Sequence, residues 1–269
     1  MNYFGVVGEK LSHSLSPVIN KRIFELIGVE GAYKTFEIPK DEIKKLPEAI
    51  KLLDIRGVNI TIPYKEVLIE QLDFISKEAK DIGAINTIFN KDGKLSGYNT
   101  DYFGFKKMLE VNNIEVKDKV CTVLGTGGAA KAVVTYLLDE GAKDIYLVTR
   151  NKAKDISVND NINIIDYKEL EGVYGDVLIN TTPVGMYPSI PRSPVSSDII
   201  KNFSILVDLI YNPKVTEFLK IGEELGKKTC DGLYMLVGQA VKSEEIWNER
   251  EISIEVINKI YKELEERFI

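Results

Sequence analysis

A short glycine-containing turn in the middle of the chain carries residue types that can bind an anion. Residues 120–124 are apolar and β-branched, as expected for a strand buried on both faces. Gly125 and Gly127 permit a tight turn, and Ala129 and Ala130 begin the helical pattern that follows. The free amides at such a helix start can bind the pyrophosphate of a dinucleotide. A glycine-rich turn without any ligand has the same pattern.

The next predicted strand ends in hydrogen-bond donors and positive charge. NAD-binding domains usually place an acidic residue here, against the ribose 2′-hydroxyl. This chain instead has Thr149, Arg150, Asn151, Lys152 and Lys154. An Arg guanidinium can bind a 2′-phosphate through two parallel hydrogen bonds. We therefore predict NADP rather than NAD as the cofactor, the alternative being a solvated basic loop.

A serine-rich stretch near the N-terminus offers hydroxyl groups beside a helix start. Ser12, Ser14 and Ser16 precede Pro17, and serine followed by proline is typical of a helix cap and first helical position. Together with the helix amides, these hydroxyls would suit a substrate carboxylate. Capping alone explains Ser16 but not Ser14. A lone loop histidine such as His13 is more often structural than catalytic.

Further polar residues interrupt apolar strands in the first hundred residues. Alternation puts Asn59 and Thr61 on one strand face, and Pro63 ends that strand so that Lys65 projects from its carboxyl end. Asp101 is predicted to cap a helix that starts near Tyr102. The stretches GAINT and GYNTD contribute the amides Asn86 and Asn99 and the hydroxyl of Thr87.

The elements that must position these residues fall into two groups. The first group has the strand-like segments 3–8, 32–38, 56–62 and 84–90 and the helical segments 17–27, 41–53 and 64–81. The second has six strand candidates, at 120–124, 144–150, 161–166, 176–182, 204–211 and 227–233. Six strands with short crossovers predict a doubly wound parallel sheet of the Rossmann type. Helical patterns at 101–111 and 233–250 flank it, and a last one covers 253–268.

We therefore predict an α/β protein of two domains. Residues 1–101 would form a substrate-binding and catalytic domain, and residues 102–236 an NADP-binding Rossmann domain. Residues 237–269 would form C-terminal helices that return to the first domain.

Composition restricts the class of protein. The 269 residues are 44% hydrophobic and 28% charged, which is typical of a globular chain long enough for two domains. A net charge of −6 argues against nucleic acid as a partner. Without a long apolar run or a signal-peptide pattern, we expect a cytoplasmic protein and no membrane. Two cysteines and one histidine cannot form a usual zinc site, so we predict no metal, with only an all-carboxylate site left open.

Taken together, the polar stretches resemble a known family. GVVGEKLSHSLSP, GVNITIPYK, GAINT, GYNTD, GTGGAA, TRNKAK, NTTPVGM, DLIYNP and DGLYMLVGQA follow one another in the order typical of shikimate dehydrogenases. The resemblance extends from about Gly5 to Trp247. It implies NADPH-dependent, reversible reduction of 3-dehydroshikimate to shikimate in the pathway to chorismate and the aromatic amino acids.

The resemblance also implies roles for individual residues. Lys65 and Asp101 would be the catalytic pair. The residues around shikimate would be Ser14, Ser16, Asn59, Thr61, Asn86, Asp101, Tyr211 and Gln239. The residues around NADP would be Gly125, Thr126, Gly127, Gly128, Ala129, Thr149, Arg150, Asn151, Lys154, Thr181 and Gly232. In the reductive direction Lys65 as ammonium would polarise the ketone and donate a proton.

Two positions depart from the family pattern. Members often have a His-Asn pair after SLSP, where this chain has Asn20 and Lys21. Many members have Asn-Arg-Thr at the end of the second Rossmann strand, and here the order is Thr149, Arg150, Asn151. The arginine is retained, which favours NADP.

Other functions stay open at this point. A dehydrogenase of the same family that acts on quinate or an aminoshikimate would have similar residues. A non-catalytic sensor of the same ligands is a further alternative, which the intact Lys65 and Asp101 disfavour. The chain shows no heptad run, so either a monomer or a homodimer is expected.

Overall fold

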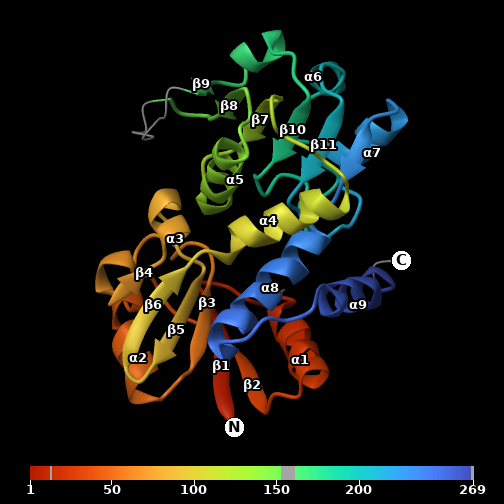
Figure 1. Cartoon of the computed structure of the whole chain (residues 1–269). Helices are drawn as coiled ribbons and strands as arrows, with labels where there is room; N and C mark the ends of the chain where they lie inside the picture. Colours follow the sequence, from red (N-terminus) through yellow and green to blue (C-terminus); the bar gives the residue numbers. More distant parts are fainter. Residues whose placement is uncertain (13, 153–160, 268–269) are drawn as a thin grey trace. The chain divides into compact units, whose positions relative to one another are not determined.

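The computed structural model describes residues 1–12, 14–152 and 161–267, and these form two compact units (Figure 1). The first unit comprises residues 1–104 and 237–264, and the second comprises residues 105–236 together with the C-terminal end. The chain passes between the units inside two helices, α4 (Thr100–Val111) and α8 (Leu233–Asn248).

The first unit is built on a mixed six-stranded sheet with the strand order β2-β1-β3-β5-β6-β4. Its strands are β1 (Asn2–Gly8), β2 (Gly31–Glu37), β3 (Gly57–Ile60), β4 (Phe74–Ile75), β5 (Thr87–Lys91) and β6 (Lys94–Tyr98). Strands β1, β2 and β3 run parallel, whereas β5 is antiparallel to both β3 and β6. The helices of this unit are α1 (Ser16–Ile27), η1 (Ile43–Lys45), α2 (Leu46–Leu52), η2 (Ile69–Gln71), α3 (Lys77–Ile82) and α9 (Ile254–Glu265).

Alternating side chains of the first sheet enter two hydrophobic clusters. Val58 and Ile88 belong to one cluster, while the next residue along β5, Phe89, packs with Phe4 and Trp247 in the other. This period of two follows from the strand pleat. Trp247 in α8 is fully buried, and its Nε1 donates to the carbonyl of Ile88 at 2.9 Å. The end of α8 is therefore an integral part of the first unit.

The C-terminal helices return to the first unit, as predicted. Arg22 in α1 donates from Nε and Nη2 to the two carboxylate oxygens of Glu263 in α9, at 2.8 and 2.7 Å. Helices α1 and α9 lie side by side at this contact (Figure 1). Ile257, Ile260 and Leu264 are the buried residues of α9, at the spacing of one helical face.

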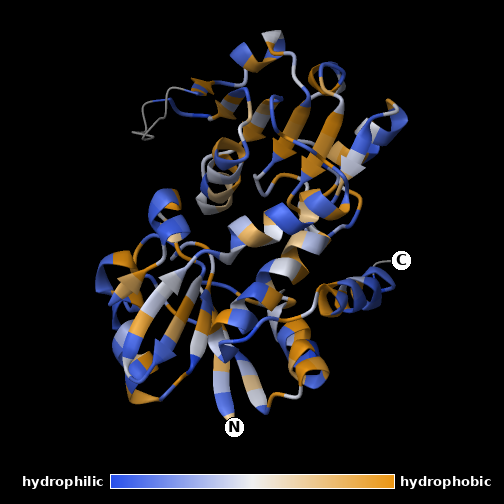
Figure 2. Ribbon diagram, in the orientation of Figure 1, coloured by the Kyte–Doolittle hydropathy of each residue, from blue (hydrophilic) through white to orange (hydrophobic). Residues whose placement is uncertain are grey.

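The second unit contains all six predicted strands in one parallel sheet, with the order β12-β11-β10-β7-β8-β9. The strands are β7 (Val120–Leu124), β8 (Asp144–Val148), β9 (Ile162–Ile165), β10 (Val177–Asn180), β11 (Ile205–Asp208) and β12 (Lys228–Cys230). The intervening helices are α5 (Gly128–Asp139), η3 (Glu169–Gly172), α6 (Ser197–Ile200) and α7 (Glu217–Glu224). Strand β10 is buried along its whole length, and Figure 2 shows the central strands in the colours of hydrophobic residues. This confirms the doubly wound α/β prediction.

Three local predictions were wrong. Residues 64–81 do not form one helix, because Phe74 and Ile75 pair with Ser96 and Gly97 as a two-residue edge strand. The spacing of apolar residues in this segment imitates a helix without forming one. Ser16 does not cap α1, which has Leu15 at the cap position and no side-chain capping bond.

The third wrong prediction concerns the start of α4. The helix begins at Thr100 rather than near Tyr102, and Asp101 lies in its first turn. The side chain of Asn99 accepts a hydrogen bond from the Asp101 amide at 3.1 Å. The Asp101 carboxylate is therefore available for other contacts.

Candidate active site

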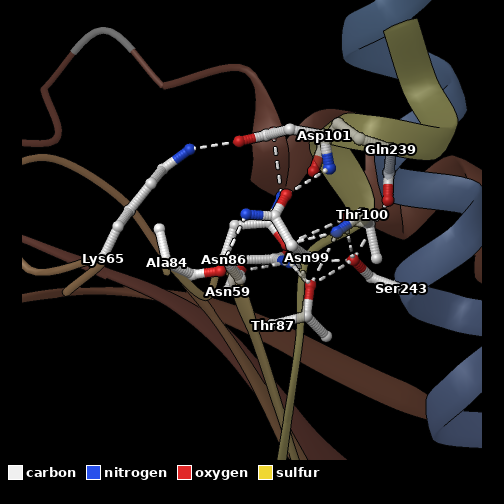
Figure 3. A network of polar contacts seen from close by, with 10 residues as sticks. All are labelled: Asn59, Lys65, Ala84, Asn86, Thr87, Asn99, Thr100, Asp101, Gln239 and Ser243. Carbon is white, nitrogen blue, oxygen red and sulfur yellow. Dashed lines mark hydrogen bonds and ion pairs between the residues drawn. The ribbon is translucent and has the colours of Figure 1, made fainter. Parts of the chain in front are cut away.

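Lys65 and Asp101 form an ion pair in the first unit. Lys65 lies in the loop after β3, and Asp101 in the first turn of α4. The Lys65 Nζ is 2.5 Å from Asp101 Oδ2, and the two side chains are only 15% and 10% exposed (Figure 3). A lysine and a carboxylate in such contact can together pass a proton to a ligand.

Asn86 holds the other oxygen of the Asp101 carboxylate. Its Nδ2 donates to Asp101 Oδ1 at 2.8 Å, and its Oδ1 accepts the backbone N–H of Thr100 at 2.7 Å. Because a backbone N–H can only donate, this contact determines which end of the Asn86 amide faces Asp101. Asn86 is 3% exposed. The carboxylate is thus held between a cation and a fixed amide.

The side-chain amide of Asn59 is directed into the same buried network. Its Oδ1 accepts the Tyr33 hydroxyl at 2.7 Å, and its Nδ2 donates to Thr87 Oγ1 at 3.1 Å and Ser243 Oγ at 2.9 Å. Burial raises the pKa of Tyr33, which keeps its hydroxyl protonated as a donor. Asn59 therefore has a framework role, whatever else it contacts.

The other predicted substrate residues are distributed over both units. Ser14 Oγ accepts the Ser16 amide at 3.3 Å, and the Ser16 side chain hydrogen-bonds that of Tyr33, so Ser16 adjoins the Asn59 network. Thr61 directly follows β3, and Gln239 lies on α8 beside the network (Figure 3). Tyr211 follows β11 in the second unit, where burial raises the pKa of its hydroxyl.

The glycine turn of the second unit combines a glycine of positive φ with an uncapped helix start. Gly125 has φ +106°, and a Cβ there would lie 3.0 Å from the side chains of Thr181 and Thr182. Gly127 is the N-cap residue of α5, with no side-chain capping bond, and the space beside its Cα is open. Thr126, Gly128 and Ala129 complete the turn and the start of α5, whose first amides have no capping side chain.

The basic end of β8 is also at the carboxyl edge of the second sheet. Thr149 is buried, with Oγ1 bonded to the amide and carbonyl of Asn151, while Arg150 and Asn151 are exposed. Lys152 forms an ion pair with Glu169, which neutralises part of its charge. Arg150 is thus an exposed cation at the strand end. Lys154 lies outside the described residues.

Thr181 and Gly232 follow β10 and β12. The Thr181 hydroxyl donates to the carbonyl of Leu124 at 2.7 Å, which ties the loop after β10 to the glycine turn. At Gly232 a Cβ would lie 2.1 Å from the carbonyl oxygen of Leu209, so only glycine fits between β11 and α8. Both residues are therefore at the same sheet edge as the glycine turn.

Sequence reasoning missed three members of the Lys65–Asp101 network, namely Tyr33, Thr100 and Ser243. Thr100 Oγ1 and Thr87 Oγ1 lie 3.1 and 3.0 Å from Asn86 Oδ1, and Ser243 joins both threonines. Their contacts span up to 184 positions of sequence, as between Asn59 and Ser243. The only signal was the presence of polar residues in otherwise apolar elements.

The described part of the chain contains neither a metal-binding cluster nor a membrane-spanning helix. Within it, no group of three or more His, Cys, Asp or Glu side chains is arranged to hold a metal ion. Among its helices, none combines the length and the apolar character needed to cross a bilayer.

A family model for the shikimate dehydrogenase substrate binding domain matches residues 6–88. The shikimate dehydrogenase (NADP(+)) of Clostridium beijerinckii is 54% identical over 269 residues, covering 100% of both chains. That of Aquifex aeolicus is 40% identical and covers 97% of this chain and 96% of its own.

Solved structures agree with these relatives. Shikimate dehydrogenase 1 from Peptoclostridium difficile matches with a TM-score of 0.96 and 57% identity, covering 100% of each chain. Shikimate 5-dehydrogenase from Thermus thermophilus, solved in complex with NADP(H) and shikimate, matches with a TM-score of 0.87 and 30% identity, covering 98% of this chain and 99% of that one. The chain therefore belongs to the family of NADP-dependent shikimate dehydrogenases and is an oxidoreductase.

Proposed function

We propose that this chain reduces 3-dehydroshikimate to shikimate reversibly, with Lys65 and Asp101 as its proton-transfer pair. The observation that carries the proposal is the 2.5 Å contact between Lys65 Nζ and Asp101 Oδ2, with Asn86 fixing the other carboxylate oxygen. The relatives named above support the substrate and the cofactor. These relatives do not favour quinate or an aminoshikimate as the substrate, nor a role as a sensor.

The proton of the reaction is handled at Lys65 Nζ. In the reductive direction the ammonium group donates a proton to the oxygen of the substrate ketone, and in oxidation the neutral amine accepts it from the hydroxyl. Asp101 orients the lysine and balances its charge.

Substrate recognition uses neutral donors and acceptors together with a site for the carboxylate. Hydroxyl and amide groups can bind the three hydroxyls of shikimate without adding charge. The proposed contacts are Ser14, Ser16, Asn59, Thr61, Asn86, Tyr211 and Gln239.

Cofactor binding is assigned to the second unit. The open glycine turn and uncapped start of α5 fit a pyrophosphate, and the exposed Arg150 fits a 2′-phosphate. When bound, NADPH supplies the hydride that reduces the ketone carbon. The proposed contacts are Gly125, Thr126, Gly127, Gly128, Ala129, Thr149, Arg150, Asn151, Lys154, Thr181 and Gly232.

The domain roles follow from these assignments. Residues 1–101 with 237–269 form the substrate domain of the proposal, and residues 102–236 the NADP domain. A cytoplasmic location, a monomer or homodimer, and the absence of nucleic-acid partners stay predictions.

The experiment that tests the proposal is Lys65→Ala in the purified chain. The variant should lose at least about a thousandfold in kcat, because it lacks the proton donor and acceptor. Shikimate binding should stay measurable by calorimetry. The matched control is Lys51→Ala, which removes a surface lysine paired with Asp73 in the same unit. Turnover of Lys65→Ala at the wild-type rate would refute the assignment.

A further inference from the structure

The hydroxyl of Ser243 lies where α8 meets the buried network beneath Asp101. Ser243 is fully buried, and its Oγ is 2.9 Å from Asn59 Nδ2, 2.9 Å from Thr87 Oγ1 and 3.2 Å from Thr100 Oγ1 (Figure 3). It also donates to the carbonyl of Gln239, one turn earlier in α8, at 3.0 Å. An ordinary helical serine makes only this last bond. The three other contacts need a separate explanation.

Hydrogen-bond accounting assigns Ser243 a definite role. Asn86 Oδ1 can accept about two hydrogen bonds. The Thr100 N–H occupies one position, which leaves room for the hydroxyl of either Thr87 or Thr100 but not both. The remaining threonine hydroxyl has Ser243 Oγ as its nearer acceptor, at 2.9 Å for Thr87 or 3.2 Å for Thr100, whereas the two threonine hydroxyls are 3.4 Å apart. Ser243 thus accepts one threonine hydroxyl and Asn59 Nδ2, and donates to Gln239, which uses its full capacity.

The orientation of Asn86 depends on this arrangement. Without an acceptor at Ser243, one buried threonine hydroxyl would keep only the long 3.4 Å contact to the other threonine, or would compete with the Thr100 amide for Asn86 Oδ1. Either change displaces Asn86, whose Nδ2 is bonded to Asp101 Oδ1. The contact path from Ser243 to the ion pair therefore runs through a threonine and Asn86.

We propose that Ser243 is a positioning residue for the reaction, which keeps both threonine hydroxyls satisfied and thereby orients Asn86 and the Lys65–Asp101 pair. This inference rests on the proposed function. Ser243 does not need to contact substrate or cofactor for it to hold. Its effect should appear in the rate of turnover and not in cofactor affinity.

The test is steady-state oxidation of shikimate by NADP with the full chain. Ser243→Ala should lower kcat about tenfold, because small displacements of reacting groups are costly, and should leave the KM for NADP unchanged. Ser243→Thr keeps the hydroxyl and should regain most of the lost kcat. Ser243→Cys, which has a similar size but a weak acceptor, should show the same loss and replaces Ser243→Ala if that variant does not fold.

The matched control is Ser76→Ala. Ser76 is also buried in the first unit, where its hydroxyl accepts the Ala79 amide at the start of α3, away from the network. This variant should keep its kcat within twofold of wild type. If Ser243→Ala did the same, or if Ser243→Thr failed to recover any activity, the inference would be overturned and the proposed function would stand. A folded wild-type chain without turnover would overturn both.

Discussion

At the level of single residues, buried acidic groups differ in how their charge is balanced. Asp101 has Lys65 as a partner, whereas Glu244 is fully buried with Asn248 Nδ2 bonded to one oxygen and no partner for the other. Burial raises the pKa of Glu244 to about 8, against smaller opposing effects of Asn248 and Arg250. The native protein therefore holds a neutral glutamic acid at neutral pH.

The raised pKa of Glu244 makes the free energy of unfolding depend on pH. The raised pKa means that the unfolded chain loses the Glu244 proton near pH 4.5 while the native chain keeps it to about pH 8. The free energy of unfolding therefore falls as pH rises through this window, and the contribution is intact only below it. Glu244→Gln removes the titration. We predict equal stability of variant and wild type near pH 4, and a variant more stable by up to about 5 kcal/mol at pH 9.

Urea unfolding at several pH values measures this difference. Comparing the two proteins cancels the contribution of Asp208, whose pKa burial raises to about 7 and which is unchanged in both. If the free energies of unfolding of variant and wild type changed with pH in parallel, Glu244 would be ionised in the native state, against this prediction.

Arg150 determines the choice of cofactor in this account. Arg150→Ala should raise the KM for NADP by about tenfold to a hundredfold, because a charge-assisted pair with the 2′-phosphate is lost. The KM for NAD should change little. Lys152→Ala is the comparison, since Lys152 is already paired with Glu169 and should have the smaller effect on NADP. An equal loss for both cofactors in Arg150→Ala would contradict the assignment.

At the level of elements, the first unit depends on the close packing of α8 against β3 and β5. Gly57 at the start of β3 lies beneath Trp247, so that an added Cβ would be 2.2 Å from Trp247 Nε1. The indole cannot move away without losing its bond to the Ile88 carbonyl. This contact brings the helix that carries Gln239 and Ser243 onto the sheet that carries Asn59.

Gly57→Ala should therefore destabilise the protein by about 3 kcal/mol, from overpacking and a strained buried hydrogen bond. Gly172→Ala is a suitable control, because open space surrounds its Cα and the expected change is within about 0.5 kcal/mol. Thermal or urea unfolding measures both. Equal stability of the two variants would mean that α8 can shift on the sheet at little cost.

Elements differed in how well the sequence predicted them. The central strands of the second unit, β7 and β10, were found because buried parallel strands are largely apolar runs between turn residues. The segment 64–81 was mistaken for a helix because the pairing of Phe74–Ile75 with β6 is a tertiary contact. Boundaries at Ser16 and Asp101 were shifted because neighbouring residues, Leu15 and Asn99, occupy the cap positions.

In the candidate site, too, some residues could be predicted from the sequence and others depend on tertiary contacts. Lys65 and Asp101 were predicted from the resemblance, and the structure places them in contact. Ser243 could not be predicted, because its importance comes from Asn59, Thr87 and Thr100, all distant in sequence. A buried hydroxyl has no sequence pattern that separates it from an ordinary helical serine.

At the level of the whole molecule, the two units contain different parts of the proposed site. The first contains the Lys65–Asp101 pair and its supporting amides, and the second contains the glycine turn and the exposed Arg150. The chain enters and leaves the second unit through α4 and α8, both of which also carry residues of the polar network in the first. The units that carry the proposed catalytic pair and the proposed cofactor residues are thus linked by continuous helices.

The most direct test of the central claim is the change in absorbance at 340 nm when the purified chain is mixed with shikimate or quinate and with NADP or NAD. We expect rapid reduction of NADP with shikimate, and much slower reactions in the other combinations. Absence of any reduction by folded protein that binds shikimate would contradict it, and would indicate a ligand-binding protein without catalysis.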